Sequence, residues 1–519
     1  MKRVLVILLA VFVLQAGMLF ARDKIVKPTD EELKKILADF DQYAAKAMTD
    51  WKVPGMAIGI VDNGTLIFAK GFGVKRAGGK DPVTENTIFQ IGSTSKAFTA
   101  TLMAMLVDRG DVRWEDKVID HAPDFMMHDP WVTREYQLLD LLSQRSGMPG
   151  YAADPLFFLG YDRPYIKQAV RHIEPVSSFR SKYAYQNVLW LVAGDIVAKY
   201  AGKTWEQALK TQIFDPLGMS NSSADKESFL DAFDVSSLHA AEDEKILAVP
   251  RNWEFLDWSY IAGPAGGINS NIVDMAKWLT FQMNNGAIDG KPLVSAANMK
   301  VVHSPKTVMN LGGEVHKNAF YCLGWIYMEH SPYPVILHNG ATLMKTMIAY
   351  VPEQKIGIVI LSNYVTDLPE LLALRFIDLY AGKPVKDISA ETLAELEKIK
   401  KRAKSAELVK PKQPSAAMPL AKYEGDYANN VYGKMNVHVA DGKLAVVMGP
   451  GNVRMALDHW DKDTFAVKLI SPLYDCGLEP GFAAFQVDPR GKVKTVTIDS
   501  LNQDGNPGVF KRVEKDAAK

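Results

Sequence analysis

The segment FQIGSTSK, residues Phe89–Lys96, carries the strongest signal for the fold. The apolar run from Ala97 to Val107 follows it directly and predicts a helix. Ser93 and Lys96 are three residues apart and would share one face of that helix. In a first helical turn, free N–H groups and a partial positive charge of about half a unit favour a negatively charged oxygen. A lysine can activate a serine hydroxyl if burial lowers the lysine pKa, so the segment predicts a nucleophile and its base.

The Ser-x-x-Lys pattern alone is a weak signal. Ser223 and Lys226 repeat it after a Pro-Leu-Gly-Met turn, where a surface stretch is the expected structure. An isolated match is more typical of a helix cap followed by a solvated lysine. The interpretation of Ser93 therefore depends on what else the chain contains.

A second motif is Tyr185-Gln186-Asn187, at the start of another apolar helical run. A tyrosine beside a lysine ammonium ionises more readily and can relay protons to a leaving group. The Asn187 amide could hold a substrate carbonyl and orient Lys96. The alternative for Tyr185 is a packed aromatic ring with a surface hydroxyl, and Tyr427-Ala428-Asn429 repeats the spacing elsewhere.

The third motif is His338-Asn339-Gly340-Ala341, which we place at the end of a short strand. A glycine there would let a substrate backbone lie against the strand edge. The N–H of Ala341 could form an oxyanion hole with that of Ser93. His338 would supply a donor or a positive charge near the leaving or terminal group, or would simply be a lone histidine at a strand end.

The order of these motifs along the chain resembles that of the penicillin-recognising serine hydrolases, and most closely the class C β-lactamase-like branch. That branch contains D-Ala-D-Ala carboxypeptidases, D-aminopeptidases, esterases and β-lactamases. Further segments carry the resemblance over roughly residues 30–385: Leu141–Tyr151, Pro216–Met219 and Ala265–Ile268. It implies an acyl-enzyme on Ser93 with Lys96 and Tyr185 as acid and base. It also implies substrate binding by Asn187, His338, Gly340 and Ala341, without a metal or an organic cofactor.

The third motif departs from the Lys-Thr-Gly common among β-lactamases. Asn339 replaces a threonine that helps to bind a substrate carboxylate, and His338 is a weaker, pH-dependent cation than lysine. We therefore expect a hydrolase of small peptides, with D-amino-acid peptides among the candidates, or of esters. A true β-lactamase and a non-catalytic peptide- or glycan-binding protein on the same fold are the alternatives.

The remaining pattern predicts an α/β fold in which an antiparallel sheet is flanked by helices and carries a mostly helical insert. Helices are expected over 30–48 (with Thr29 as cap), 97–107, 187–200, 271–283 and 367–380, and strands over 56–61, 66–69, 319–328, 335–338, 344–351 and 356–361. We expect this domain to span 22–385, followed by a charged helix and Pro-containing linker over 386–415. Alternating runs over 434–439, 443–448, 464–469 and 492–498 predict a small all-β sandwich or barrel within 416–519, of open function.

Composition restricts the other classes. The chain has 519 residues, with Lys+Arg 60 and Asp+Glu 60, and this zero net charge argues against nucleic-acid binding. The two cysteines, Cys322 and Cys476, exclude a cysteine-built metal cluster, and we expect both to be unpaired thiols. Residues 1–21 have the basic start and apolar run of a signal peptide, which predicts a secreted or periplasmic protein. No later stretch predicts a membrane span, and oligomerisation is possible.

Overall fold

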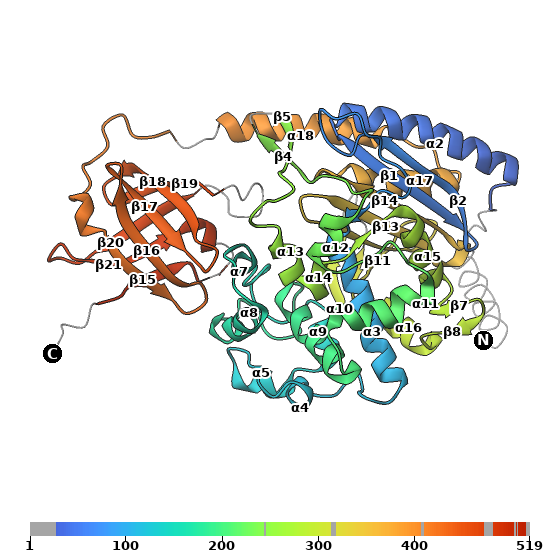
Figure 1. Ribbon diagram of the computed structural model, residues 1–519, viewed down its shortest axis with the longest axis horizontal. Helices are drawn as coiled ribbons and strands as arrows, with labels where there is room; N and C mark the ends of the chain where they lie inside the picture. Colours follow the sequence, from blue (N-terminus) through green and yellow to red (C-terminus); the bar gives the residue numbers. More distant parts are fainter. Residues whose placement is uncertain are drawn as a thin grey trace, which may run out of the picture.

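The computed structural model describes residues 27–242, 245–312, 318–405, 409–471, 481–502, 505 and 507–514. The predicted signal peptide and Cys476 lie outside these residues. Figure 1 shows a large mixed domain beside a smaller β-barrel, with α7 (Pro155–Phe158) and α8 (Arg163–Ala169) on the side nearest the barrel. No helix in the described part of the chain is long and apolar enough to cross a membrane.

The large domain is built on one antiparallel sheet of eight strands. In spatial order the strands are β2 (Thr65–Gly73), β1 (Gly55–Asp62), β14 (Ile356–Ser362), β13 (Lys345–Val351), β12 (Val335–Ala341), β11 (Ile326–Met328), β10 (Ala319–Tyr321) and β9 (Thr307–Asn310). The pairing of β1 with β14 joins the two ends of the domain, from Met56 opposite Ser362 to Asp62 opposite Ile356. This confirms the predicted α/β class and the antiparallel sheet.

One face of the sheet is covered by α2 (Asp30–Asp50) and α17 (Leu368–Tyr380), with α18 (Ile388–Ser405) packed beside them. The helix α2 begins as expected at Thr29, whose hydroxyl accepts from the backbone N–H of Glu32 while the Glu32 carboxylate accepts from the Thr29 N–H. Its apolar stripe buries Phe40 against Phe376 of α17 at a ring separation of 5.5 Å. The resulting core closes this side of the sheet.

The other face carries α15 (Ile272–Met283) and the helical insert, with α3 (Ser95–Asp108) at its centre. The remaining helices are α4 (Val118–His121), α5 (Pro130–Glu135), α6 (Leu138–Leu141), α9 (Val188–Ala201), α10 (Trp205–Leu209), α11 (Asp215–Leu217), α12 (Lys226–Asp231), α13 (Asp257–Ile261), α14 (Gly263–Gly266) and α16 (Ala296–His303). Three small ribbons pair β3 (Phe89–Gln90) with β6 (Asn269–Ser270), β4 (His239–Glu242) with β5 (Lys245–Ala248), and β7 (Ala287–Ile288) with β8 (Lys291–Pro292). Since Ser95 to Leu106 are all buried, α3 is a core helix and not an amphipathic surface helix.

The small domain is a closed barrel, which resolves the expected choice between sandwich and barrel. Its strands are β15 (Gly425–Asn429), β16 (Gly433–Ala440), β17 (Lys443–Met448), β18 (Val453–Asp461), β19 (Thr464–Leu469), β20 (Phe482–Val487), β21 (Val493–Ile498) and β22 (Val509–Arg512). Alternating buried residues such as Leu444, Val446 and Met448 fill it.

The barrel contacts the large domain through polar and close backbone contacts. The Tyr161 hydroxyl donates to the Tyr432 carbonyl at 2.9 Å, and the N–H of Gly451 donates to the Leu159 carbonyl at 2.9 Å.

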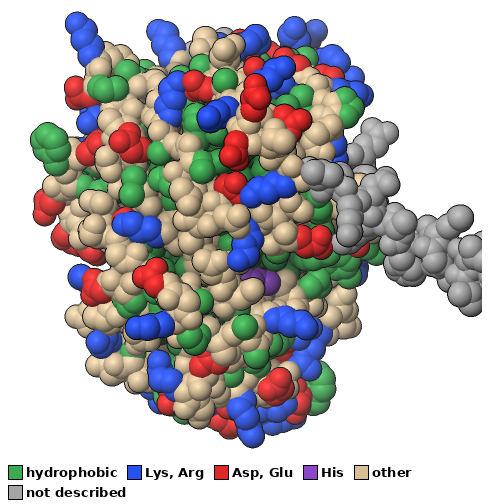
Figure 2. Space-filling view, turned by 90° about the vertical axis from the view of Figure 1, so that its right-hand side faces the viewer, with side chains coloured by type: hydrophobic (Ala, Val, Ile, Leu, Met, Phe, Trp, Pro, Cys, Tyr) green, Lys and Arg blue, Asp and Glu red, His purple; other side chains and the backbone are tan. Residues whose placement is uncertain are grey.

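Figure 2 shows the face of the large domain that lies opposite the barrel. Basic and acidic side chains are interspersed there, in keeping with the zero net charge of the chain.

Candidate active site

Ser93 lies in a single 3₁₀ turn, η1 (Gly92–Thr94), that leads directly into α3. Gly92 has φ +51°, and a Cβ on it would lie 2.7 Å from the backbone nitrogen of Ala341. Only glycine tolerates both the left-handed backbone and this approach to β12. The turn therefore holds Ser93, which is partly exposed, close to the third motif.

The Lys96 side chain is fully buried, and its ammonium nitrogen Nζ has three partners. Ser93 Oγ lies at 3.1 Å, Asn187 Oδ1 at 2.6 Å and the Ala265 carbonyl at 2.9 Å. Burial lowers the Lys96 pKa to about 7, although the Asp154 carboxylate opposes the shift. A neutral amine has two N–H groups and one lone pair. Because Asn187 and Ala265 can accept both N–H groups, the lone pair is left for the Ser93 hydroxyl.

Tyr185 lies close enough to Ser93 for the Ser93 side chain to act on the Tyr185 pKa, and Lys96 Nζ lies 4.7 Å from the centre of the Tyr185 ring. Three motif residues that are distant in sequence thus meet at one point. We expected the lysine to ease ionisation of the phenol, but burial of Tyr185 acts in the opposite direction. Burial raises the Tyr185 pKa well above its usual value, so Tyr185 is a neutral phenol near pH 7.

Two glutamines hold the Tyr185–Asn187 segment in place. The Gln144 side chain donates to the Gln186 carbonyl at 3.1 Å and accepts from the Gln186 N–H at 2.7 Å. The Gln186 amide donates in turn to the Pro149 carbonyl at 2.5 Å. These contacts give Gln144 a positioning role that the sequence alone did not suggest. Arg145 next to it pairs with Asp140, away from Ser93.

The third motif forms the end of β12, as expected, but the strand continues to Ala341 and not only to residue 338. A Cβ on Gly340 would lie 2.0 Å from the Ile91 carbonyl oxygen and 3.0 Å from the Ser93 nitrogen. Gly340 is therefore required for contact between β12 and the Ser93 turn. This corrects our expectation that it makes room for a substrate backbone.

The N–H of Ala341 points away from β13. Thr342 donates to the Met344 carbonyl across the hairpin, and hydrogen-bonded pairs alternate along an antiparallel ladder. The pair Ala341–Lys345 is thus not hydrogen-bonded, and the free Ala341 N–H faces the Ser93 turn. The Ala341 N–H is therefore not used in the β12–β13 ladder, which is a condition for the oxyanion-hole role that we expected for it.

His338 is buried under the cavity and is not a cation. Its Nδ1 lies 2.5 Å from the Asn339 carbonyl, so Nδ1 carries the proton and Nε2 accepts from the Tyr321 hydroxyl at 3.2 Å. Burial, reinforced by Lys96, lowers the His338 pKa to about 3. The positive charge considered for His338 is therefore absent near pH 7. The Asn339 side-chain amide donates to the Glu370 carboxylate at 3.5 Å.

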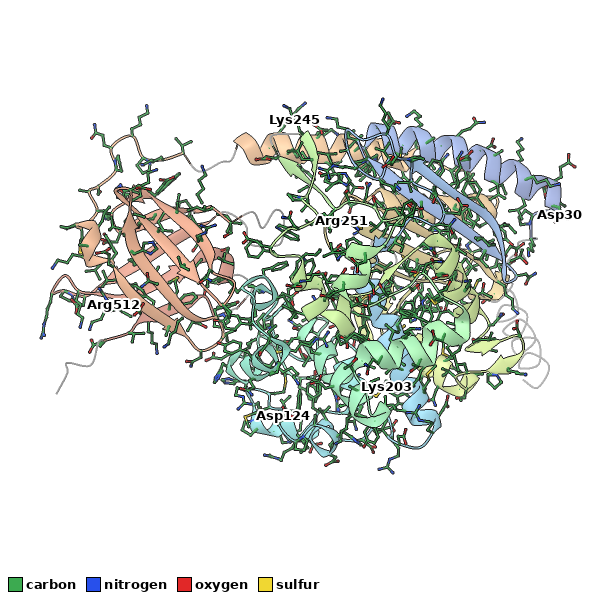
Figure 3. The ribbon with its side chains drawn as sticks, viewed as in Figure 1. Asp30, Asp124, Lys203, Lys245, Arg251 and Arg512 are labelled. Carbon is green, nitrogen blue, oxygen red and sulfur yellow. The ribbon has the colours of Figure 1, made fainter. Side chains whose placement is uncertain are left out.

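A cavity of about 660 Å³ opens onto Ser93 between the large domain and the barrel. The residues that line it are Ser93, Gly150, Tyr151, Asp154, Pro155, Phe158, Tyr183, Tyr185, Asn187, Trp258, Met309, Ile326, His338, Asn339, Ala341, Thr342, Lys345, Tyr432, Ser500 and Leu501. Five of the seven predicted site residues thus reach one cavity. Of the other two, Lys96 lies behind Ser93, and Gly340 of β12 faces the Ser93 turn. By contrast, exposed charged residues such as Asp30 and Lys245 lie at the outer edge in Figure 3.

Within the described ranges, no group of three or more His, Cys, Asp or Glu side chains could hold a metal ion. The site is instead made of a hydroxyl, an amine, a phenol and two backbone amides. Such a set can deprotonate a hydroxyl and stabilise an oxyanion.

Comparison with known proteins agrees with this arrangement. The family model described as Beta-lactamase matches residues 40–382. This chain belongs to the beta-lactamase family. A second model, a domain of unknown function (DUF3471), matches residues 409–512, the part that forms the barrel.

Relatives within the beta-lactamase family carry different names. The chain is 28% identical over 452 residues to "Unguisins hydrolase ungD" of Aspergillus violaceofuscus (strain CBS 115571), covering 80% of this chain and 79% of the relative. It is 29% identical over 281 residues to "Penicillin-binding protein 4" of Amycolatopsis lactamdurans, covering 53% and 71%. An octameric penicillin-binding protein homologue from Pyrococcus abyssi has the same fold, with a TM-score of 0.60, 22% identity and coverage of 89% and 98%.

Two charged residues that line this cavity, Asp154 and Lys345, were missed in the sequence. Asp154 Oδ2 accepts from Asn187 Nδ2 at 2.6 Å, and burial raises the Asp154 pKa to about 7. In the sequence it precedes Pro155, which is typical of an ordinary helix cap. Its place beside Asn187 results from tertiary packing, which no local pattern reveals.

Proposed function

We propose that this protein is a serine hydrolase that acts outside the cytoplasm, forms an acyl-enzyme on Ser93, and cleaves amide or ester bonds of small substrates. The observation that carries the proposal is the buried Lys96 amine, held by Asn187 and Ala265 with its remaining position directed at Ser93 Oγ. A pKa of about 7 lets this amine both accept and return a proton near neutral pH.

In the proposed reaction, Lys96 takes the proton of Ser93 Oγ while that oxygen bonds to the substrate carbonyl carbon. Lys96 is favoured over Tyr185 for this step because the raised pKa of Tyr185 keeps its phenol protonated. The N–H groups of Ser93 and Ala341 donate to the oxyanion. When the oxyanion collapses, the bond to the leaving nitrogen or oxygen breaks. That atom takes the proton of the Tyr185 hydroxyl, and Tyr185 regains a proton from Lys96.

Deacylation repeats these steps with water as the nucleophile. Water loses a proton to Lys96, attacks the ester carbonyl and releases the acid, and Ser93 Oγ regains its proton. The expected class is a peptidase, with peptides of D-amino acids among its candidate substrates, or an esterase. The name of the Aspergillus relative, a hydrolase, supports hydrolysis over binding alone.

The second candidate is β-lactam hydrolysis, and one observation favours it. The Lys345 side chain lines the cavity beside Ala341, so a cation is available for a substrate carboxylate although His338 is neutral. The penicillin-binding protein among the relatives is consistent with such a ligand.

A labelling experiment tests the first proposal. A fluorophosphonate should label the wild type, and Ser93→Ala should abolish labelling. Ser223→Ala, which alters the second Ser-x-x-Lys match, should leave labelling unchanged. Labelling that persists in Ser93→Ala would refute Ser93 as the nucleophile. A panel of D- and L-amino-acid amides, p-nitrophenyl esters and nitrocefin then ranks the classes. Faster turnover of nitrocefin than of the esters would favour the β-lactamase.

A further inference from the structure

Two buried polar atoms in the Ser93 cavity lack a hydrogen-bond partner. They are Asp154 Oδ1, from the large domain, and the Tyr432 hydroxyl, from the barrel; neither has a partner within the part of the chain that the structure describes. Both residues line the cavity, and Tyr432 has no exposed surface. A buried polar atom without a partner is destabilising, so two of them in one cavity mark a position where a polar group of a ligand can bind.

The two groups are held in place from different directions. Asn187 Nδ2 donates a hydrogen bond to Asp154 Oδ2 at 2.6 Å, so Oδ1 is the carboxylate oxygen that remains without a partner among the described residues. Tyr432 lies between β15 and β16, and its carbonyl accepts from the Tyr161 hydroxyl at 2.9 Å. The carbonyl of the preceding residue, Val431, accepts from the Tyr165 hydroxyl at 3.2 Å. The Asp154 carboxylate lies close enough to contribute to the raised pKa of Tyr432. Both groups therefore line one cavity, and their hydrogen bonds fix them before a ligand arrives.

The surroundings indicate which ligand fits. Asp154 carries the one carboxylate among the described residues that line the cavity. Aromatic rings line the same cavity, including Phe158 and Trp258, whose ring centres lie 4.7 Å apart, and Tyr151. Aromatic faces attract a cation, and a primary ammonium has enough N–H groups to donate to both free oxygens. A bound ammonium would also compensate the burial of the Asp154 carboxylate.

We propose that Asp154 and Tyr432 form a subsite for a primary ammonium group of the substrate, with the carboxylate from the large domain and the hydroxyl from the barrel. This inference rests on the proposed function and narrows its substrates to amides or esters that carry a free amine. It also gives the barrel a role in substrate selection.

The test uses alkyl fluorophosphonates that react at Ser93 and end in either a free amine or an acetamide. Short, medium and long tethers are compared, because the distance from Ser93 to the subsite sets the best length. For at least one tether, the wild type should react about tenfold or more faster with the amine than with the acetamide, as expected for a charged hydrogen bond. Asp154→Asn should bring this ratio near one, and Tyr432→Phe should lower it.

Two features keep the outcomes distinct. The ratio is taken within each variant, so a general loss of Ser93 reactivity in Asp154→Asn cancels. Tyr380→Phe is the matched control, because Tyr380 is also buried with a hydroxyl lacking a partner among the described residues but does not line this cavity. Equal rates with amine and acetamide at every tether, or a preference that survives Asp154→Asn, would overturn the subsite while Ser93 stays the nucleophile. Failure of every probe to label the wild type would refute the proposed function itself.

Discussion

Replacement of Gly340 by alanine should disable the site without removing any proposed catalytic group. The added Cβ would lie 2.0 Å from the Ile91 carbonyl oxygen, whereas a carbon and an oxygen in contact are normally about 3.3 Å apart. Either β12 or the Ser93 turn must therefore move by about 1.3 Å. This movement separates the amides of Ser93 and Ala341, and loss of one oxyanion donor costs about 10²–10³ in rate. Overpacking should also cost about 1–3 kcal/mol of stability.

The assay is the second-order rate constant for labelling of Ser93 by a neutral fluorophosphonate, measured alongside a thermal melt. Gly266→Ala is the matched control, because a Cβ there would meet the same turn at an ordinary 3.6 Å from the Gly92 carbonyl carbon. We expect Gly340→Ala to label at least about a hundredfold more slowly than Gly266→Ala, with both proteins folded. Labelling of Gly340→Ala at the wild-type rate would refute the proposed contact between β12 and the nucleophile turn.

Three further predictions concern other parts of the chain. In Gln144→Glu, an oxygen takes the place of the side-chain NH₂ group that donates to the Gln186 carbonyl. The free energy of unfolding should fall by about 1–3 kcal/mol and Ser93 labelling should slow, whereas an unchanged melting temperature would contradict the role given to Gln144. Burial raises the pKa of the Cys322 thiol to about 12, so at pH 8 iodoacetamide should alkylate Cys322 in the unfolded protein but not in the native protein. Equal alkylation rates in the two states would show that the thiol is accessible. Exported protein should begin at residue 22 on N-terminal sequencing, and an intact first segment would argue against cleavage.

Local sequence signals were sufficient for most elements. The Thr29 cap, the apolar runs of α9 and α15, and the alternating residues of β17 and β19 each carry their own periodicity. The expected strand over 319–328 is instead two strands, β10 and β11. Gly324 between them has φ +73°, and its Cβ would lie 2.8 Å from the Ala97 nitrogen. A contact with α3 therefore fixes this turn.

The residue types of the site could be predicted from the sequence better than their charge states and hydrogen-bond partners. The motif order brought Ser93, Lys96, Tyr185 and Asn187 together correctly. The charge states depend on burial, which the sequence does not give: burial makes His338 neutral and keeps Tyr185 protonated. The partners Gln144, Asp154 and Tyr432 come from a loop, a helix cap and the barrel, and only the folded chain places them around one cavity.

The central claim is that a neutral Lys96 amine near pH 7 activates Ser93, and the pH dependence of Ser93 labelling tests it most directly. Because burial lowers the Lys96 pKa to about 7, the amine is the base above that pH, so the rate should rise through pH 7 and level off at higher pH. The Asp154 carboxylate raises the Lys96 pKa, so Asp154→Asn should move the midpoint to lower pH. A rate that is flat through pH 7, or one that rises only near the usual lysine pKa of about 10.4, would contradict the account.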